Sequence, residues 1–444
     1  MKSSPPDSLP DSSALPCSLG EWLGLLEFRH HKAIDLGLER CREVWLRMDS
    51  PSPAERIFVV AGTNGKGSTV ATICGLLEGL GYRYGCYTTP HIHSYNERIQ
   101  VSGQVVSDAM LIDAFERVEA ARGEVSLSYF EFGTLAAFLI LADSGLDFAV
   151  MEVGLGGRLD AVNLLDADCA VITPVGLDHQ EYLGNDLYSI GTEKAGIIRP
   201  GRPLVCGEAE PPASILEIAA RNGAPVVRLE KDFSARTCGD HSCFRMGGLE
   251  LELPLPVLRG AHQLNNAATG LAAVLQLIPE AATRPGALSR GLASVELRGR
   301  FDRVHDDPDV WIDVGHNPMG AKVIAQALRA RGAGSGRKIR CVLAMLADKD
   351  AEAVAAELSA VISSWYCAGL LGDRGQSGQR LAQRVASVIG TETVKVFERV
   401  HEALQSALDE SEPGDGVLVF GSFHTADEAG SMMVNLHNGA GATG

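Results

Sequence analysis

Residues 57–69 read IFVVAGTNGKGST, and this stretch decides the fold. Its first part, IFVVA, is an apolar run that predicts a buried parallel strand, and the apolar residues of positions 66–80 predict the helix that follows. A glycine-rich turn between a strand and a helix can direct backbone N–H groups at an anion. The helix N-terminus and the side chain of Lys66 add positive charge. The stretch therefore predicts a cradle for the phosphates of a nucleotide.

The spacing of this cradle departs from the common phosphate loop. The common pattern has four residues between its first glycine and Gly-Lys, followed at once by Ser or Thr. Here only Thr63 and Asn64 separate the first two glycines, and Gly67 intervenes before Ser68. The hydroxyls of Ser68 and Thr69 could bind a phosphate or a Mg²⁺ ion. The alternative is an ordinary tight turn, which would leave the combination of glycines, lysine and hydroxyls unexplained.

Composition limits the class of protein. The chain has 444 residues, of which 45% are hydrophobic, enough for two or three globular domains. A formal net charge of −17 argues against a nucleic-acid partner, because a phosphate backbone requires a basic face. No stretch approaches the ~20 apolar residues of a membrane span, so we expect no membrane partner. Residues 1–16 carry Ser and Pro without the apolar core of a signal peptide, which predicts a disordered lead-in to a cytoplasmic protein.

The cysteines show no regular framework. Ten of them lie between Cys17 and Cys367, and this scatter favours reduced thiols over disulfides. The nearest approach to a zinc signature is the segment from Cys238 through His241 to Cys243, which lacks a second ligand pair at zinc-finger spacing. We therefore expect a β-hairpin with incidental cysteines there.

Strands and helices alternate along the chain. After the cradle helix, strands are predicted at 83–87, 147–153 and 169–173, and helices at 107–122, 129–142, 187–198 and 262–278. A short polar hinge at 297–301 precedes a second alternation, with strands at 310–314, 340–346, 365–368, 394–397 and 416–420 and helices at 319–331, 350–361, 378–389, 400–410 and 426–437. The pattern predicts an α/β protein with two parallel-sheet domains. A ligand cleft is expected between them.

Groups able to bind a metal recur where predicted strands end. Thr89 follows the strand at 83–87, Glu152 closes the next strand, and His179 lies just beyond the third. Open α/β sheets place their ligands at such carboxyl ends, and a carboxylate in a buried strand is costly unless it meets a cation. Together with the cradle, these residues predict ATP and Mg²⁺ held for phosphoryl transfer.

Spacing alone leaves the phosphoryl acceptor open. GTP hydrolysis is a rival, but residues 347–350, ADKD, match the base-recognition pattern of GTPases poorly. A small-molecule kinase would give the second domain little purpose. Residues 154–160 look like a dinucleotide fingerprint but fail it, because Leu159 stands where the third glycine is required.

Ten short blocks of the chain carry a resemblance. In order they are GTNGKGST, TTPHIHSYNERI, SYFEFGTLAA, MEVGLGGRLDAVN, GLDHQEYLG, EKAGII, LRGRFD, DVGHNP, LADKD and GSFHT. They are similar, in the same order, to the motifs of the folylpolyglutamate synthase/dihydrofolate synthase family, which belongs to the ATP-dependent Mur ligases. The resemblance runs from about residue 19 to residue 425, which is nearly the whole chain.

The resemblance implies amide-bond formation driven by ATP. The γ-phosphate would pass to a substrate carboxylate to give an acyl phosphate, which the amine of L-glutamate attacks. The implied substrates are ATP, L-glutamate, dihydropteroate and folates, handled by a monomer in the cytoplasm. The implied fold has a lead-in at 1–18, an N-terminal P-loop-type ATPase domain at 19–297 that also binds the pterin, and a smaller C-terminal Rossmann-like α/β domain at 298–444 that is the glutamate-ligase domain.

The resemblance assigns the nucleotide and the catalytic residues by position. The residues expected to bind ATP are Thr63, Asn64, Gly65, Lys66, Gly67, Ser68, Asn266, Arg300 and Asp313. The catalytic set is expected to be Lys66, Lys194 and His316, with His316 near the γ-phosphate or the incoming glutamate. Asn266 could instead cap a helix.

The resemblance also implies the metal ligands. Thr89, Glu152 and His179 match the positions that bind Mg²⁺. Lys194 matches a lysine that is carbamylated in the family, and its carbamate would be an anion able to orient a second Mg²⁺. Carbamylation requires a neutral amine, and a buried lysine beside cations can lose its proton. The alternative for Lys194 is a solvated surface charge. The implied cofactors are ATP and two Mg²⁺ ions, with a K⁺ ion allowed.

Three segments match positions that contact the pterin substrate. They are Ile34, Asp35, Leu36 and Gly37; Ser128, Tyr129, Phe130 and Glu131; and Leu159, Asp160 and Ala161. Tyr129 and Phe130 supply aromatic surface for a flat ring, and Asp35 or Asp160 offers an acceptor to its amino-pyrimidine edge. The alternative for the aromatic pair is a place in a helix core.

The chain departs from the family pattern at one hinge position, and three alternative functions stay open. Arg298 stands where the family tends to have proline, which predicts a looser hinge. A folylpolyglutamate synthase without the dihydropteroate activity is one alternative. A UDP-muramyl amino-acid ligase is a second, and the pterin-site blocks argue against it. A non-catalytic nucleotide-binding regulator is a third, and the intact set of Lys66, Glu152, His179 and Lys194 argues against that.

Overall fold

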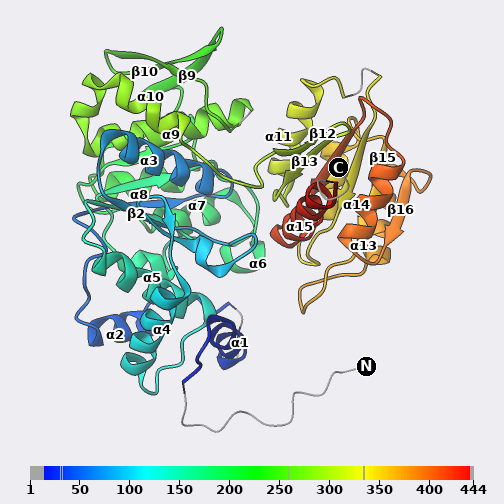
Figure 1. Ribbon diagram of the computed structural model, residues 1–444. Coiled ribbons are helices and arrows are strands. Elements are labelled where there is room, and N and C mark those ends of the chain that lie inside the picture. Colours follow the sequence, from blue (N-terminus) through cyan, green and yellow to red (C-terminus); the bar gives the residue numbers. More distant parts are fainter. Residues whose placement is uncertain (1–14, 31, 33, 259, 334–335, 441–444) are drawn as a thin grey trace.

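The computed structural model describes residues 15–30, 32, 34–258, 260–333 and 336–440, which form two lobes (Figure 1). Residues 1–14 of the expected lead-in lie outside the described residues. Helix α1 (Leu19–Arg29) is capped by Ser18, whose side chain accepts a hydrogen bond from the backbone N–H of Glu21 while the Glu21 carboxylate accepts from the Ser18 backbone N–H. This reciprocal cap fixes where regular structure starts.

The larger lobe is built on one eight-stranded sheet. Its strands are β1 (Arg56–Ala61), β2 (Tyr84–Tyr87), β3 (Ile99–Val101), β4 (Gln104–Val105), β5 (Phe148–Glu152), β6 (Cys169–Ile172), β7 (Leu204–Cys206) and β8 (Val226–Arg228). They lie in the order β4-β3-β2-β5-β1-β6-β7-β8, parallel except for β3 and β4 at one edge. The register pairs Val60 of β1 with Glu152 and Ala61 with Ile172, so the three central strands end together.

Helices cover both faces of this sheet. They are α1, α2 (Glu39–Arg47), α3 (Lys66–Leu80), α4 (Asp108–Arg122), α5 (Tyr129–Asp143), α6 (Gln180–Leu183), α7 (Leu187–Ala195), α8 (Ala213–Arg221), α9 (Ala261–Leu277) and α10 (Pro285–Ala293). Three 3₁₀ helices, η1 (Tyr95–Arg98), η2 (Ala161–Leu164) and η3 (Pro279–Thr283), connect them. In β1, Val59 packs into the core that contains Trp22, whereas Phe58 packs into the opposite core with Ile73. Burial on both faces explains why this strand is continuously apolar.

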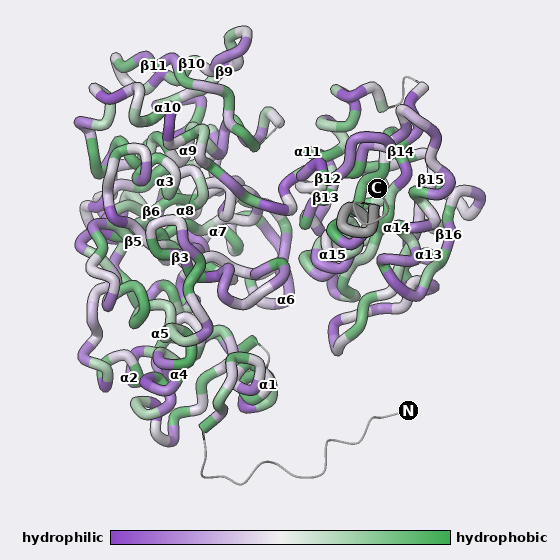
Figure 2. The backbone as a smooth tube through the Cα atoms, viewed as in Figure 1, coloured by the Kyte–Doolittle hydropathy of each residue, from purple (hydrophilic) through white to green (hydrophobic). Residues whose placement is uncertain are grey.

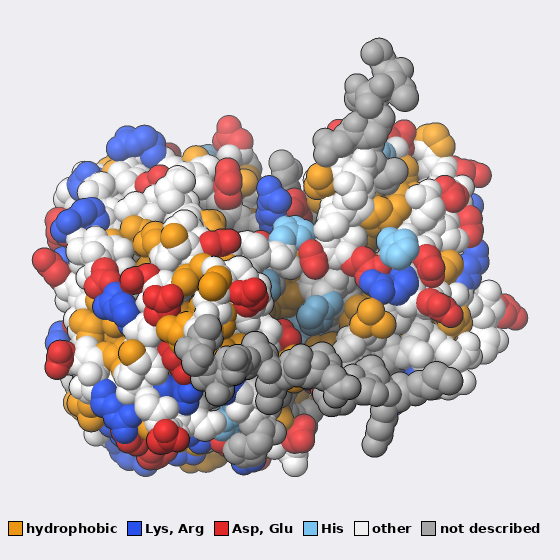
Figure 3. Space-filling model, turned by 60° about the horizontal axis from the view of Figure 1, so that its bottom comes forward, with side chains coloured by type: hydrophobic (Ala, Val, Ile, Leu, Met, Phe, Trp, Pro, Cys, Tyr) orange, Lys and Arg blue, Asp and Glu red, His pale blue; other side chains and the backbone are white. Residues whose placement is uncertain are grey.

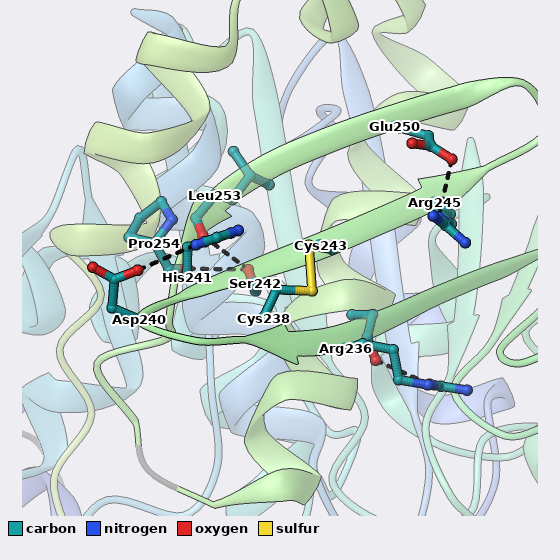
Figure 4. The surroundings of a disulfide bond; sticks show 11 residues. Arg236, Cys238, Asp240, His241, Ser242, Cys243, Arg245, Glu250, Leu253 and Pro254 are labelled. Carbon is teal, nitrogen blue, oxygen red and sulfur yellow. Dashed lines mark hydrogen bonds and ion pairs between the residues drawn. A yellow bond between two sulfur atoms is a disulfide. The ribbon is translucent and has the colours of Figure 1, made fainter.

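A small antiparallel sheet on the larger lobe contains a disulfide (Figure 4). Its strands are β9 (Phe233–Cys238), β10 (His241–Met246) and β11 (Leu249–Pro254), so the hairpin expected there is confirmed. The expectation of reduced thiols was wrong for Cys238 and Cys243, which are bonded to each other. The turn between β9 and β10 brings their Cα atoms to 6.1 Å, a separation that a disulfide can span. The pairing is local to one turn, so the cysteine spacing over the whole chain gave no sign of it.

The smaller lobe carries a six-stranded sheet. Its strands are β12 (Asp302–Asp306), β13 (Asp309–Asp313), β14 (Ile339–Leu343), β15 (Ser364–Ala368), β16 (Val394–Phe397) and β17 (Gly416–Phe420). They lie in the order β12-β13-β17-β14-β15-β16, and only β12 is antiparallel to its neighbour. The helices are α11 (Pro318–Arg329), α12 (Ala351–Leu358), α13 (Gly378–Ile389), α14 (Val400–Asp409) and α15 (Phe423–Ala440). Strand β12 was not predicted, because its sequence DRVHD is polar, as suits a sheet edge.

The α/β fold with two mostly parallel sheets is therefore confirmed. Each lobe has hydrophobic segments in its interior (Figure 2). The domain limits at residues 18, 19, 297 and 298 stay a prediction. Among the described residues, no helix combines the length and the apolar character that crossing a bilayer requires.

Candidate active site

A cavity of about 360 Å³ lies between the lobes, and the hollow there is bordered by histidine side chains in Figure 3. The larger lobe lines it with the turns that follow β1, β2, β5 and β6, and the smaller lobe with the loop after β13 and the start of α11. Every residue that the resemblance assigns to the nucleotide, the metal or catalysis lines this cavity, whereas Thr69, whose hydroxyl was also a candidate ligand, is fully buried and does not. The assigned residues are Thr63, Asn64, Gly65, Lys66, Gly67, Ser68, Thr89, Glu152, His179, Lys194, Asn266, Arg300, Asp313 and His316. The structure brings them together, while their individual roles stay predictions.

Glycines shape the phosphate cradle. Gly65 is the N-cap of α3 with φ +92°, and a Cβ placed on it would lie 2.5 Å from Asn266 Oδ1. A Cβ on Gly62 would collide with the side chain of Thr173. Lys66 lies along the loop, and its Nζ donates to the carbonyl oxygens of Gly62 at 3.3 Å and Thr63 at 3.5 Å. Only glycine lets the backbone approach this closely, and the N–H groups of Thr63 and Asn64 donate to the carbonyl oxygen of Pro174 at 3.0 and 3.4 Å.

Glu152 is a buried carboxylate beside two cations. Burial raises its pKa, and the positive charges of Lys66 and Arg300 oppose that shift. Its Oε2 accepts a hydrogen bond from the backbone N–H of Thr89 at 3.2 Å. The strand-end carboxylate predicted to need a cation therefore has cations nearby, and it can bind a further one.

Lys194 of α7 is 4% exposed, which rules out a solvated surface charge. Its Nζ donates to the carbonyl oxygen of Gly62 at 2.8 Å. Burial lowers the pKa of Lys194 to about 7, and the charge of Lys66 adds to the effect. A large share of the amine is therefore neutral near pH 7, which is the state that carbamylation requires.

Asp178 of the larger lobe contacts three side chains of the smaller lobe. Its carboxylate accepts hydrogen bonds from Lys349 Nζ at 2.7 Å and Asn317 Nδ2 at 3.3 Å, and lies 3.5 Å from His316 Nε2. Burial opposes ionisation, but the hydrogen bond from His316 and the charge of Lys349 hold the pKa of Asp178 well below its usual range. Asp178 is therefore ionised at neutral pH and links the two lobes.

His179 is held in a left-handed backbone conformation, with φ +50°. Burial lowers the pKa of His179 to about 4, so the ring is neutral at physiological pH. Its Nε2 lies 3.5 Å from Lys349 Nζ. A neutral imidazole can act as a metal ligand.

Two asparagines join the cradle to the smaller lobe. Asn64 Nδ2 donates to Asn317 Oδ1 at 3.0 Å, and Asn317 Nδ2 donates back to Asn64 Oδ1 at 2.9 Å. Asn317 also caps α11 by accepting from the backbone N–H of Gly320 at 2.9 Å. In the same lobe, Asp313 accepts from the backbone N–H groups of Phe301 and Gly315, which orients its carboxylate at the end of β13.

A second cavity, of about 270 Å³, adjoins the first. All the residues expected to contact the pterin line it: Ile34, Asp35, Leu36, Gly37, Ser128, Tyr129, Phe130, Glu131, Leu159, Asp160 and Ala161. The two cavities share Thr89, Pro90, Gly154, Leu155 and His179 as wall residues. A ligand filling the second cavity would therefore reach the phosphate cradle past His179 and Thr89.

The carboxylates of the second cavity differ in their surroundings. Asp35 and Glu131 are each 2.8 Å from the guanidinium of Arg40. Asp160 accepts from the backbone N–H groups of Leu155 and Val162, both at 2.9 Å. Burial raises the pKa of Asp160 to about 6. Asp160 is therefore a buried acceptor without a side-chain cation bound to it among the described contacts.

Sequence reasoning missed several residues of the two cavities. Asp178, Arg98 and His262 line them, and Lys349 and Asn317 contact their walls. Four of the five lie in the quoted blocks, in GLDHQEYLG, TTPHIHSYNERI, LADKD and DVGHNP, which was the available signal. His262 lies outside every block.

The comparisons with known proteins agree with this geometry. Residues 60–274 match the Mur ligase middle domain, and residues 299–423 match the Mur ligase, glutamate ligase domain. The chain is 41% identical over 409 residues to the dihydrofolate synthase/folylpolyglutamate synthase of Escherichia coli (strain K12), covering 92% of this chain and 93% of the relative.

Solved structures are similar over almost their whole length. A structure of E. coli FolC in complex with DHPP and ADP has a TM-score of 0.87 and 38% identity, covering 97% of this chain and 100% of that one. A bifunctional folylpolyglutamate synthase/dihydrofolate synthase with Mn, AMPPNP and L-glutamate bound has a TM-score of 0.85 and 40% identity, covering 96% of this chain and 99% of that one.

Proposed function

We propose that this chain, which belongs to the dihydrofolate synthase/folylpolyglutamate synthase family of Mur ligases, joins L-glutamate to dihydropteroate and to the γ-carboxylate of folates. It is an ATP-dependent ligase that forms a carbon–nitrogen bond. The observation that carries the proposal is the shared wall between the two cavities: one contains a phosphate cradle, and the other contains aromatic surface and carboxylate acceptors. A flat ring with an extended carboxylate arm could occupy both.

The residues present fit ATP and a divalent metal. The space at Gly65 admits no Cβ, and Lys66 adds positive charge beside it, as a phosphate requires. The Thr89 hydroxyl, the Glu152 carboxylate and the neutral ring of His179 line one region of the cavity and would hold Mg²⁺, with water completing the shell. A carbamate on Lys194 would supply a further ligand for a second ion. When bound, the metal would neutralise charge on the transferring phosphoryl group.

The chemistry requires two steps. A carboxylate is a poor electrophile, because expelling oxide from it is prohibitive. An oxygen of the substrate carboxylate therefore attacks the γ-phosphorus, ADP leaves, and an acyl phosphate remains. The glutamate amine then attacks the acyl carbon, inorganic phosphate leaves, and the nitrogen loses a proton. Lys66 holds the phosphate charge during the first step.

The smaller lobe completes the site. His316 and Asn317 lie at the start of α11 and reach Asp178 of the larger lobe. Closure of the two lobes would bring glutamate to the acyl phosphate and exclude bulk water, which would limit hydrolysis of the intermediate. We assign Asn266, Arg300 and Asp313 to the nucleotide and His316 to the γ-phosphate or the glutamate.

The proposal also covers the partners, the oligomeric state and the compartment of the chain. The partners are small molecules, namely ATP, L-glutamate, dihydropteroate and folates, with no nucleic acid and no membrane. We propose that the chain acts as a monomer in the cytoplasm.

Formation of ADP and phosphate should be measured with dihydropteroate, a reduced folate or a UDP-muramyl peptide precursor, each with L-glutamate. We expect turnover with the first two and none with the third. Turnover with the folate alone would restrict the function to chain extension. Turnover with the UDP-muramyl substrate alone would overturn the proposal.

A further inference from the structure

Arg98 places a buried positive charge at the wall of the second cavity. It is the last residue of η1, is 8% exposed, and lines the cavity together with Tyr129 and Phe130. Neither the predicted pterin contacts nor the proposed mechanism uses it.

The partners of Arg98 are neutral groups. Its Nε donates to Nδ1 of His91 at 2.9 Å, its guanidinium also hydrogen-bonds the hydroxyl of Tyr87, and its Cζ lies 4.8 Å from the ring centroid of Tyr95 and 5.6 Å from that of Tyr129. Burial lowers the pKa of His91 to about 4 and raises the pKa of Tyr129 to about 12, so both are uncharged at neutral pH. Among the ion pairs of the described residues, none gives Arg98 a carboxylate within 4.0 Å.

Arg40, in contact with the same cavity wall, is held differently. Its guanidinium is 2.8 Å from both Asp35 and Glu131. A buried guanidinium without an anion is costly, and aromatic faces offset only part of that cost. The structure therefore keeps a desolvated hydrogen-bond donor beside the cavity, where a ligand can accept from it.

We propose that Arg98 donates both arms of its guanidinium to O4 and N5 of the pterin ring, and thereby selects 4-oxo over 4-amino pterins. This inference rests on the proposed function. In a 7,8-dihydropterin, O4 and N5 are neighbouring acceptors on one edge, in the same arrangement as O6 and N7 of guanine, which arginine reads with two hydrogen bonds. The opposite edge, with its 2-amino group and N3–H, donates, and Asp160 is a buried acceptor in the same cavity.

The selectivity follows from donor and acceptor matching. A 4-amino group is a donor and would face the donors of Arg98, which leaves buried N–H groups unpaired. Loss of a bidentate arginine contact costs about 5- to 150-fold in discrimination. The pterin is remote from the reacting carboxylate, so the effect should appear chiefly in KM for the pterin.

The test compares kcat/KM for dihydropteroate and 4-amino-4-deoxydihydropteroate, each with ATP and L-glutamate. The wild type should prefer the 4-oxo substrate by at least fivefold. Arg98→Met should lower this ratio severalfold, and Arg98→Lys should give an intermediate ratio. A residual preference is expected at Asp160, because N3 of a 4-amino pterin carries no proton to donate. Arg117→Met is the matched control, because Arg117 pairs with Asp143 on the surface and should leave the wild-type ratio intact. A ratio near one in the wild type, or an unchanged ratio in Arg98→Met, would overturn the inference.

Binding of the two pterins to the wild type and to Arg98→Lys, measured by titration calorimetry, provides a second readout. It is used if Arg98→Met does not fold: equal affinities in the wild type, or the same ratio of affinities in Arg98→Lys, overturn the inference, and a smaller ratio in Arg98→Lys supports it. If the wild type binds dihydropteroate but never releases ADP with it, the proposed function fails, while the change of the binding ratio in Arg98→Lys still decides the role of Arg98.

Discussion

Lys349 Nζ of the smaller lobe lies 2.7 Å from Asp178 Oδ1 of the larger lobe, and both side chains are almost fully buried. Lys349 follows β14, and Asp178 follows β6, so the ion pair spans the carboxyl ends of the two sheets. The neighbouring pair of amide hydrogen bonds between Asn64 and Asn317 crosses the same gap. These contacts lie directly beside the phosphate cradle, and a further ion pair, between His93 and Asp427 at 2.7 Å, joins the lobes at α15.

Replacing Lys349 with Met should loosen this arrangement. The change leaves Asp178 as a buried anion with less compensation, and an uncompensated buried charge costs about 3 kcal/mol or more. Opening the lobes would expose Asp178 to water and relieve that cost. We expect a larger radius of gyration by small-angle X-ray scattering and a fall of about 10- to 100-fold in kcat/KM for glutamate.

Two variants control this prediction. In the double variant Asp178→Asn, Lys349→Met, kcat/KM for glutamate should fall by less than the sum of the two single effects on a free-energy scale. The reason is that neither change then leaves an unpaired buried charge. Lys395→Met removes an exposed pair with Glu410 and should change neither readout. An unaltered radius and rate in Lys349→Met would show that the ion pair does not hold the lobes.

Gly65→Ala and Gly81→Ala form a matched pair at the two ends of α3. Both glycines are left-handed, with φ +92° and +84°, so each substitution should cost about 1–2 kcal/mol of stability. Only at Gly65 would the new Cβ also meet another residue, Asn266 Oδ1 at 2.5 Å, whereas a Cβ on Gly81 would have no atom of a more distant residue within 4 Å. We therefore expect ATP affinity, measured by calorimetry, to fall at least tenfold in Gly65→Ala alone. Equal affinities in the two variants would contradict the shape of the cradle described above.

Lys66→Ala should nearly abolish turnover. The variant removes one of the two lysines that contact the cradle carbonyls, the other being Lys194, and losing one preorganised charge at a transferring group costs about 100- to 1,000-fold in kcat. Release of ADP with saturating substrates measures the loss. Lys231→Ala, at a partly exposed pair with Glu210, is the control and should keep full activity. Full activity in Lys66→Ala would refute the phosphate assignment.

Lys194→Ala should lose activity that short carboxylates partly restore. A carbamate on Lys194 would present an anion where the variant leaves a space, so added formate or acetate can occupy it. We expect partial rescue of ADP release at millimolar carboxylate, and no rescue in Lys66→Ala under the same conditions. In the wild type, a carbamate signal should appear by ¹³C NMR after incubation with ¹³C-bicarbonate. Failure of every carboxylate to rescue would count against the carbamate.

The same lysine gives a pH signature in stability. Its pKa falls from the ordinary 10.5 to about 7 in the folded protein, so the unfolded chain binds more protons between these values. Stability contributed by this group therefore rises from about pH 7 to pH 10.5, and below pH 7 the cost of burying the charged amine is complete. Lys194→Met should stabilise the protein most below pH 7, and the gain should shrink as pH rises. Denaturant titrations of both proteins from pH 6 to pH 9 measure it, and a gain that does not change with pH would contradict the lowered pKa.

Much of the fold could be read along the chain. The alternation of apolar runs and amphipathic segments, with glycines at the turns, predicted most strands and helices to within a few residues, because backbone periodicity is a local property. The pattern did not predict strand β12 or the edge strands β3 and β4, since short polar edge strands carry little of it. It also did not predict the short helices α2, α8 and α10. The cradle at residues 62–68 was also evident, because its glycines and Lys66 are adjacent.

The sequence by itself determined the strand ends, the glycine turn and the residue types able to bind phosphate and metal, all of which are encoded within a few neighbouring positions. Tertiary structure alone decided that residues 34–37, 128–131 and 159–161 enclose one cavity, that Lys349 meets Asp178 from 171 positions away, and that Cys238 is bonded to Cys243. It also decided the charge states of Lys194 and His179. The physical reason is that desolvation and long-range pairing depend on what packs around a side chain, which no local pattern specifies.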